Sequence, residues 1–286
     1  YPSYLGYGWM KRYLEKLAEF VSTESDLKIA IAQINPTVGD LAGNAEKIEN
    51  IYENVRHKSD LVIFPEMCIT GYPPQDLLLE SEFVLQTENI LSTLAAKTEA
   101  TPLISGTVRK KNGEIKNCAA ILQNGEITGY RDKSLLPTYD VFDEDRYFNA
   151  ASENHPLELH HNKSVVKIGL HICEDLWNTT SEDDIVCQLA DEGAELLINL
   201  SASPYCVNRV EERIKLVRKK VEMTGKPFIY CNLVGAQDEL VFDGYSFVVN
   251  EYGDLIHLSP AFTEDVSIID LDNSRRIDYY PIVASK

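Results

Sequence analysis

Val165-Val-Lys-Ile-Gly-Leu-His-Ile-Cys173-Glu-Asp-Leu-Trp177 is the most informative stretch of the chain, an apolar segment that runs straight into a cysteine and two acidic residues. A short apolar run of this kind predicts a buried strand. A cysteine on the tight turn after such a strand is exposed, and nearby backbone N–H groups can stabilise an oxyanion. The stretch therefore indicates a nucleophile at Cys173, although a small buried core cysteine fits these residues equally well.

Strands and amphipathic helices alternate on both sides of this stretch. Strands are predicted at residues 27–34, 61–64, 103–108, 119–122, 126–130, 165–172, 196–200, 228–233, 241–249, 255–258 and 266–271. Helices are predicted at residues 44–58 (capped by Asn44), 77–96, 182–192 and 210–223. The pattern indicates an α/β fold in layers, with helices outside a mixed sheet system. We expect one domain at 27–271, an N-terminal extension at 1–26 with a helix at 10–21, and a C-terminal tail at 272–286.

The composition excludes several classes of protein. The 286 residues carry 27 Lys and Arg against 45 Asp and Glu, a net charge of −18, which disfavours nucleic acid and anionic membrane surfaces as partners. No apolar run approaches the ~18 residues of a membrane span. The six cysteines contain no CxxC pair, so a zinc ribbon or a thioredoxin-type redox pair is excluded, and we expect reduced thiols in a cytoplasmic protein.

Two further strand ends carry charged residues. The apolar run at 61–64 is stopped by Pro65, which places Glu66 at the rim of the sheet beside apolar neighbours. Such a setting raises the pKa of a carboxyl group, as a general base at neutral pH requires. Lys133 follows the hairpin at 119–130 and precedes a loop rich in aromatic and charged residues. An ordinary surface glutamate or a helix-capping one is the alternative for Glu66, and a solvated surface lysine is the alternative for Lys133.

Six spaced motifs agree with one family in residue type and order. They are Phe64-Pro-Glu66, Tyr72-Pro-Pro-Gln-Asp-Leu-Leu78, Leu136-Pro-x-Tyr139-x-Val-Phe-Asp-Glu144-x-Arg-Tyr-Phe148, Cys173-Glu-Asp-Leu-Trp177, Asn199-Leu-Ser-Ala-Ser203-Pro and Gly235-x-Gln-Asp-Glu-Leu-Val-Phe-Asp243-Gly. Over residues 27–271 the chain resembles the nitrilase or carbon–nitrogen hydrolase superfamily, which uses a Glu–Lys–Cys triad in this chain order. The similarity is greatest to the glutaminase domain of glutamine-dependent NAD synthetases.

The resemblance implies a four-layer α-β-β-α sandwich that forms homo-oligomers through its helical face and needs no cofactor or metal. It implies that Cys173 attacks the side-chain amide of glutamine and forms a thioester. Glu66 is then the general base. Lys133 stabilises the oxyanion and biases Cys173 toward the thiolate. Glu144 matches the second glutamate of the superfamily, which orients Lys133 and the substrate.

The resemblance also implies a substrate pocket. It is lined by Tyr139, Ser203 and Arg209 and walled by Tyr72 and Trp177. The guanidinium of Arg209 suits a substrate carboxylate, which it can bind with two parallel hydrogen bonds. The alternative for Arg209 is the first turn of a surface helix. Two positions depart from the family pattern: Asp140 stands where glycine is usual, and Tyr245 where a small residue is usual.

Other functions fit the sequence less well. A Cys–His pair of His171 and Cys173 is disfavoured, because the ring of a residue two positions away on a strand points along the sheet normal. The pair His160-His161 and the run at 143–145 lack the ligand spacing of known metal sites. The Ser-Gly-Gly-x-Asp-Ser loop of an ATP-binding synthetase domain does not occur. We therefore expect either the glutaminase part of an NAD synthetase, which supplies ammonia to a partner domain or subunit that amidates deamido-NAD, or a free amidase for another ω-amide. A catalytically silent scaffold subunit is a third alternative.

Overall fold

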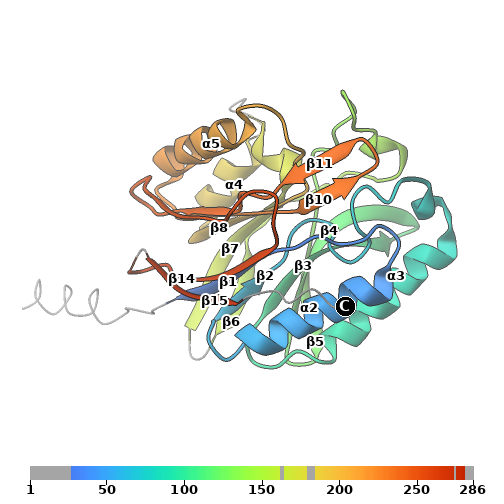
Figure 1. Cartoon of the computed structure of the whole chain (residues 1–286), viewed down its shortest axis with the longest axis horizontal. Coiled ribbons are helices and arrows are strands. Elements are labelled where there is room, and N and C mark those ends of the chain that lie inside the picture. Colours follow the sequence, from blue (N-terminus) through green and yellow to red (C-terminus); the bar gives the residue numbers. More distant parts are fainter. Residues whose placement is uncertain (1–26, 162–163, 179–183, 274, 281–286) are drawn as a thin grey trace, which may run out of the picture.

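Two β-sheets face each other at the centre of the molecule (Figure 1). The computed structural model describes residues 27–161, 164–178, 184–273 and 275–280. One sheet has seven strands, in the order β15 (Arg275–Tyr280), β14 (Asp265–Asp270), β1 (Lys28–Gln33), β2 (Leu61–Ile63), β3 (Leu103–Lys111), β4 (Glu114–Gln123) and β5 (Glu126–Asp132). The other has six, in the order β13 (Leu255–Leu258), β12 (Phe247–Val249), β9 (Phe228–Asn232), β8 (Leu196–Ser201), β7 (Ser164–Ile172) and β6 (Leu157–His161). A small third sheet pairs β10 (Val234–Gln237) with β11 (Leu240–Asp243).

Helices cover the outer face of each large sheet (Figure 1). Helices α2 (Leu41–Val55) and α3 (Ser81–Ala95) pack on the seven-stranded sheet, and α4 (Ile185–Asp191) and α5 (Arg209–Thr224) pack on the six-stranded sheet. Side chains alternate along β1, so that Ile29 and Ile31 enter the core between the sheets while Ala30 and Ala32 face the helices. The four-layer α-β-β-α sandwich that the sequence predicted is confirmed.

Strand direction brings several strand ends to one edge of the sandwich. In the seven-stranded sheet β1, β2 and β3 run parallel, and two antiparallel turns make β5 run in the same direction as β3. In the other sheet β7, β8 and β9 run parallel. In parallel strands the carboxyl ends share one edge of the sheet, which is where ligands bind in α/β folds. Glu66 and Lys133 follow β2 and β5, and Cys173 follows β7.

Several predicted boundaries differ from the structure. The strand expected at 241–249 is divided between β11 and β12, which belong to different sheets, because Gly244 (φ 72°) and Tyr245 (φ 52°) turn the chain between them. Helix α2 begins at Leu41 and is capped by Asp40, whose side chain accepts from Gly43 N. Asn44 lies inside this helix and ties the loop before it to the rest of the chain through Thr37 and Ile69.

Other segments were absent from the sequence prediction or fall beyond the described residues. The helix expected at 77–96 begins as a 3-10 turn (Gln75–Leu79) before α3, and strands β6, β10 and β15 were not predicted. Residues 275–280, assigned to a tail, form β15 at the edge of the seven-stranded sheet. The extension at 1–26 with its helix at 10–21, the first two residues of the helix at 182–192, and residues 281–286 lie outside the described residues.

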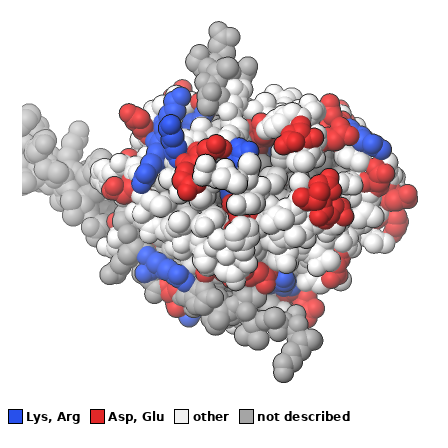
Figure 2. Space-filling view, turned by 45° about the horizontal axis from the view of Figure 1, so that its top comes forward, with Lys and Arg blue, Asp and Glu red and all other residues white. Residues whose placement is uncertain are grey.

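The surface carries the charge excess of the sequence. Figure 2 shows Asp and Glu side chains spread over the visible face, with Lys and Arg in a few separate clusters. No helix in the described ranges combines the length and the apolar character that crossing a bilayer requires.

Candidate active site

A lysine lies between two carboxylates at the shared strand edge. Lys133 Nζ donates to Glu66 Oε1 at 2.9 Å and to Glu144 at 2.8 Å. Lys133 and Glu66 are 1% exposed and Glu144 is 5% exposed. A charge buried this deeply persists only when it is paired and hydrogen-bonded. The three side chains therefore form one buried charged cluster, and the surface alternatives for Glu66 and Lys133 are wrong.

Each oxygen of the Glu66 carboxylate has partners from a different part of the fold. Oε1 accepts from Asn117 Nδ2 at 2.7 Å as well as from Lys133. Oε2 accepts from the backbone N–H of Ala202 at 2.7 Å, just beyond the end of β8. The backbone carbonyl of Asn117 also accepts from Lys133 N at 2.8 Å. Glu66 is therefore fixed in orientation by both sheets at once.

The charges of this cluster act on one another. Burial would lower the pKa of Lys133, but the carboxylates of Glu144 and Glu66 raise it well above its ordinary value, so Lys133 is an ammonium ion. Burial raises the pKa of Glu144 to about 7, and the negative charge of Glu66 acts in the same direction while Lys133 opposes it. A carboxyl group that titrates near neutrality, beside a permanent cation, is typical of catalytic sites.

Cys173 occupies the turn that the sequence predicted, but it is 6% exposed and packs in the core between the sheets. The exposed position expected for it is therefore wrong, and its burial matches the alternative of a core cysteine. Its φ of 43° lies in the left-handed region, and a 3-10 turn (Cys173–Leu176) starts there directly after β7. Residues held in that region cluster at functional sites. Burial, then the negative charge of Glu66, raises the pKa of the thiol well above its ordinary value, while Lys133 lowers it without reversing the shift. The net shift runs against the thiolate bias that the resemblance implied.

The alternative Cys–His pair is not formed. His171 donates from Nδ1 to the carbonyl of Gly169 at 3.0 Å, and its ring packs edge-on against Phe228 at 5.3 Å. Among the described residues its Nε2 has no hydrogen-bond partner, so the Cys173 thiol is not bound to it. Burial lowers the pKa of His171 to about 4, which keeps the ring neutral.

Cys173 opens into a cavity of about 260 Å³ that collects most of the predicted pocket residues. Its walls include Tyr139, Trp177, Ser203 and Arg209. The Arg209 guanidinium carbon lies 5.2 Å from the centre of the Trp177 ring. Arg209 is also the first residue of α5 and pairs with Glu212 at 3.2 Å, so it has both the pocket position and the helix-turn position that the sequence left open.

The family model of carbon-nitrogen hydrolases matches residues 28–280, which include every strand of both large sheets. The chain belongs to the carbon-nitrogen hydrolase family.

Relatives of this hydrolase include much longer enzymes. The glutamine-dependent NAD(+) synthetase of Synechocystis sp. is 41% identical over 262 residues, which cover 86% of this chain and 46% of that protein. The enzyme of the same name from Thermotoga maritima is 39% identical over 249 residues, covering 86% of this chain and 42% of that protein. The hydrolase chain therefore spans about half the length of these relatives.

Solved structures give the same fold. The glutamine-dependent NAD+ synthetase of Acinetobacter baumannii, in complex with adenosine diphosphate, superimposes with a TM-score of 0.79 at 31% identity, covering 90% of the hydrolase chain and 48% of that chain. An amidase of Nesterenkonia sp. AN1 superimposes with a TM-score of 0.74 at 21% identity, covering 87% and 91% of the two chains. The second likeness concerns the fold alone.

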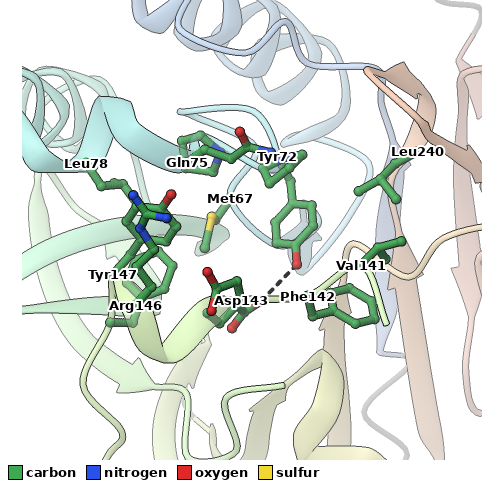
Figure 3. A pocket seen from close by; sticks show the side chains of 14 residues that line it. Met67, Tyr72, Gln75, Leu78, Val141, Phe142, Asp143, Arg146, Tyr147 and Leu240 are labelled. Carbon is green, nitrogen blue, oxygen red and sulfur yellow. Dashed lines mark hydrogen bonds between the residues drawn. The ribbon is translucent and has the colours of Figure 1, made fainter. Parts of the chain in front are cut away.

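Tyr72 lies in a different cavity of the hydrolase from the one that the sequence suggested. A space of about 230 Å³ adjoins the first and shares Val141, Phe142 and Leu240 with it. In Figure 3 the ring of Tyr72 points from the Gln75 side of this space toward Phe142, and its hydroxyl donates to Glu144 Oε1 at 3.0 Å. Tyr72 therefore contacts the charged cluster from the second cavity and does not line the Cys173 cavity.

The two departures from the family pattern have different places. Asp140 lines the Cys173 cavity with a φ of 56°, a left-handed conformation that glycine adopts without strain. Tyr245 is not among the residues that line that cavity. Asp140 is thus the departure that lies on the wall of the Cys173 cavity.

Sequence reasoning missed three contributors to the site. Asn117 and the Ala202 N–H hold Glu66, and Glu174 accepts from the Tyr139 hydroxyl at 2.8 Å on the cavity wall. Glu174 follows Cys173 directly, so its place beside the nucleophile was the one signal that could have found it. Nothing local to Asn117 marks it, and the motif at 199–203 that contains Ala202 does not indicate that its N–H binds Glu66, because both bonds cross between distant strands.

Proposed function

We propose that this chain is a cysteine amidohydrolase that converts L-glutamine to glutamate and ammonia. The observation that carries the proposal is the buried cluster of Lys133 with Glu66 and Glu144, next to the cavity into which Cys173 opens. A base and a fixed cation beside a thiol are the groups that acyl transfer requires.

In the first half of the proposed reaction, the Cys173 sulfur attacks the amide carbon while Glu66 takes the thiol proton. The raised pKa of the thiol makes this transfer necessary, because the resting group is protonated. The carbonyl oxygen becomes an oxyanion, which the Lys133 ammonium stabilises. The tetrahedral intermediate then breaks its C–N bond, Glu66 returns the proton to nitrogen, and ammonia leaves a thioester on Cys173.

In the second half, Glu66 takes a proton from water, and the resulting hydroxide attacks the thioester. The second tetrahedral intermediate expels the Cys173 thiolate, which recovers its proton from Glu66. Glu144 keeps Lys133 in place from the opposite side, with Tyr72 holding the Glu144 carboxylate. Because Glu66 is held by Asn117 and Ala202 as well, it returns to the same position after each transfer.

We infer that the cavity recognises the α-carboxylate and α-amino group of glutamine. Arg209 offers a guanidinium for the carboxylate. Ser203 lines the cavity, and its Oγ accepts from Arg213 at 3.2 Å, which leaves the second lone pair of the hydroxyl oxygen to accept from the α-ammonium group. The names of the relatives, glutamine-dependent NAD(+) synthetases, support glutamine as the amide and amidation of deamido-NAD as the use of the ammonia.

Ammonia release tests the proposal against its nearest alternative, an amidase for another ω-amide. We expect turnover of glutamine and poor turnover of propionamide, because a site with polar groups rejects an analogue that leaves them unpaired. A thioester trapped on Cys173 by acid quench and found by mass spectrometry would support the mechanism. Equal rates for the two amides would favour the general amidase, and no turnover of either amide would favour the silent scaffold.

A further inference from the structure

A buried carboxylate outside the triad joins the two sheets at the catalytic edge. Asp175 Oδ1 accepts from the backbone N–H groups of Ser134, at 3.0 Å, and Leu135, at 2.8 Å. Its Oδ2 accepts from the N–H of Ile172 at 3.0 Å. Ser134 directly follows Lys133, and Ile172 directly precedes Cys173. One side chain therefore contacts the backbone next to both groups that handle the reacting carbonyl.

The two segments that Asp175 joins come from opposite halves of the sandwich. Lys133 follows β5 of the seven-stranded sheet, and Cys173 follows β7 of the six-stranded sheet. Core packing between the sheets is apolar and does not fix the separation of their rims. Hydrogen bonds to a shared carboxylate are directional, so they fix it more closely.

Burying the ionised carboxylate of Asp175 costs hydration free energy. Asp175 is 0% exposed, and burial raises the pKa of its carboxyl group to about 6, although its backbone partners and Lys133 oppose that shift. The group is therefore ionised at pH 7 only because three N–H donors and a nearby cation compensate for lost hydration. An apolar residue would fill the space without this cost, but it would leave the buried N–H of Ile172 and the partly buried N–H groups of Ser134 and Leu135 without this acceptor.

We propose that Asp175 is a positioning residue that sets the placement of Lys133 relative to Cys173, and that it acts on the chemical step while leaving substrate binding largely unchanged. This inference rests on the proposed function for the identity of the reaction. Asp175 does not line the cavity, so it acts through the backbone of its neighbours. A displacement of about 1 Å between reacting groups costs up to ~10²-fold in rate.

The test is Asp175→Asn, which keeps the volume and one acceptor oxygen. Its amide nitrogen would face either Ile172 N–H or the N–H groups of Ser134 and Leu135, donor against donor. We expect kcat for glutamine to fall about 10- to 100-fold with KM changed less than about threefold. The alkylation rate of Cys173 by chloroacetamide, followed by mass spectrometry, should fall in parallel.

Asp184→Asn is the matched control for loss of a buried carboxylate. Asp184 is 3% exposed, accepts from Cys187 N at 3.1 Å and pairs with Lys220, away from Lys133 and Cys173. We expect it to lower the midpoint of thermal unfolding while kcat and the alkylation rate stay near wild type. A wild-type chain that alkylates at Cys173 without hydrolysing glutamine would overturn the proposed function alone, since alkylation still reports on Asp175.

Wild-type kcat and alkylation rate in folded Asp175→Asn would overturn the inference. So would a loss confined to KM, which would place Asp175 in substrate binding. If the variant does not fold, amide hydrogen exchange of the wild type decides. Protection of the Ser134 and Leu135 amides supports the bridge, and exchange of these amides at free-peptide rates overturns it.

Discussion

The two sides of the Cys173 site differ in how firmly they are held. On the inner side, Glu66, Lys133 and Glu144 are buried, and each makes at least two polar contacts. On the outer side, Tyr139 is 55% exposed and the Arg209 side chain 35% exposed. Within the described part of the chain, the side chain of each has one hydrogen-bond or ion-pair partner, Glu174 for Tyr139 and Glu212 for Arg209. The inner side has the rigidity that chemistry requires, and the outer side has the adaptability of a binding surface. Substitutions should therefore cost more on the inner side.

The largest effect is expected at the nucleophile. Cys173→Ala should reduce ammonia release from glutamine to the background rate, because no other thiol can replace a sulfur fixed on this turn. The fold should persist, since alanine fits the space that a 6% exposed cysteine leaves. Ammonia assay and circular dichroism of the same preparation measure both.

Covalent labelling tests this prediction against a second accessible thiol in the same cavity. Cys206 is exposed and lines the same cavity as Cys173. A chloroketone analogue of glutamine should modify Cys173 and none of the other five thiols, and Cys206→Ser should label as fast as the wild type. Modification of Cys206 with Cys173 untouched would remove the nucleophile assignment.

The next largest effect is expected at Lys133. Loss of one oxyanion donor costs about 10²–10³ in kcat. Lys133→Met should cost more, because it also leaves Glu66 and Glu144 as like charges in a buried site, and one of them will then hold a proton. Lys133→Arg should not rescue, since the planar guanidinium is larger and directs its donors differently. The measurement is the steady-state kcat for glutamine of the wild type, Lys133→Met and Lys133→Arg.

Lys220→Met is the matched control for the loss of a buried lysine. Lys220 is also 1% exposed and paired with a carboxylate, that of Asp184. The Lys220→Met variant should have a lower midpoint of thermal unfolding and keep the wild-type kcat. Near-wild-type hydrolysis by Lys133→Met would contradict the triad at its middle member and would erase the difference between the two sides of the site.

The inner side was also the more predictable from sequence, for a local reason. Glu66 and Cys173 come after apolar strands and Lys133 comes after a hairpin strand, and a charged or nucleophilic residue at such a strand end is visible in the chain itself. Asn117, Ala202 and Asp175 were not predictable as partners, because their bonds to Glu66 and Ser134 join residues 51, 136 and 41 positions apart. Such pairings depend on which strand ends meet, which propensity and periodicity do not encode.

The fold shows the same division. Long periodic segments such as α2 and α5 were predicted within a few residues. Strand β11 was not separated from β12 and β10 was not predicted, since both β10 and β11 are short and the small sheet they form exists only through their pairing. Tyr72 was assigned to the wrong cavity for a similar reason: its contacts, with the Phe242 ring at a centroid distance of 6.0 Å and with Glu144, join residues far apart in the sequence.

On the outer side, Arg209 should show a smaller effect that appears in substrate selection. A hydrogen bond to a charged group contributes about 1.5–3 kcal/mol, which corresponds to a factor of about 10–100. Arg209→Met should lower kcat/KM for glutamine by that factor and leave propionamide hydrolysis unchanged. Arg218→Met on the same helix, whose guanidinium binds the Gly253 carbonyl at 3.0 Å, is the control and should change neither. An equal loss of kcat/KM for glutamine and propionamide would mean that Arg209 acts in the chemical step and not in substrate recognition.

The smallest effect is expected at the Tyr139 hydroxyl, and it tests the comparison from the other direction. Tyr139→Phe keeps the ring and its edge-on contact with Phe142 at 5.7 Å, so it removes only the bond to Glu174. A hydrogen bond of this kind contributes about 0.5–1.5 kcal/mol when buried, and less at an exposed wall where water replaces it. We expect kcat/KM for glutamine to fall about two- to threefold, while Tyr252→Phe, at a tyrosine 81% exposed outside the cavity, has no effect. A loss above about 100-fold would mean that this hydroxyl contacts the reacting atoms. Losing a hydrogen bond at an exposed wall can lower the rate that much only if substrate binding buries the Tyr139 hydroxyl and aligns it with the oxyanion. The outer wall would then be held as firmly as the buried cluster.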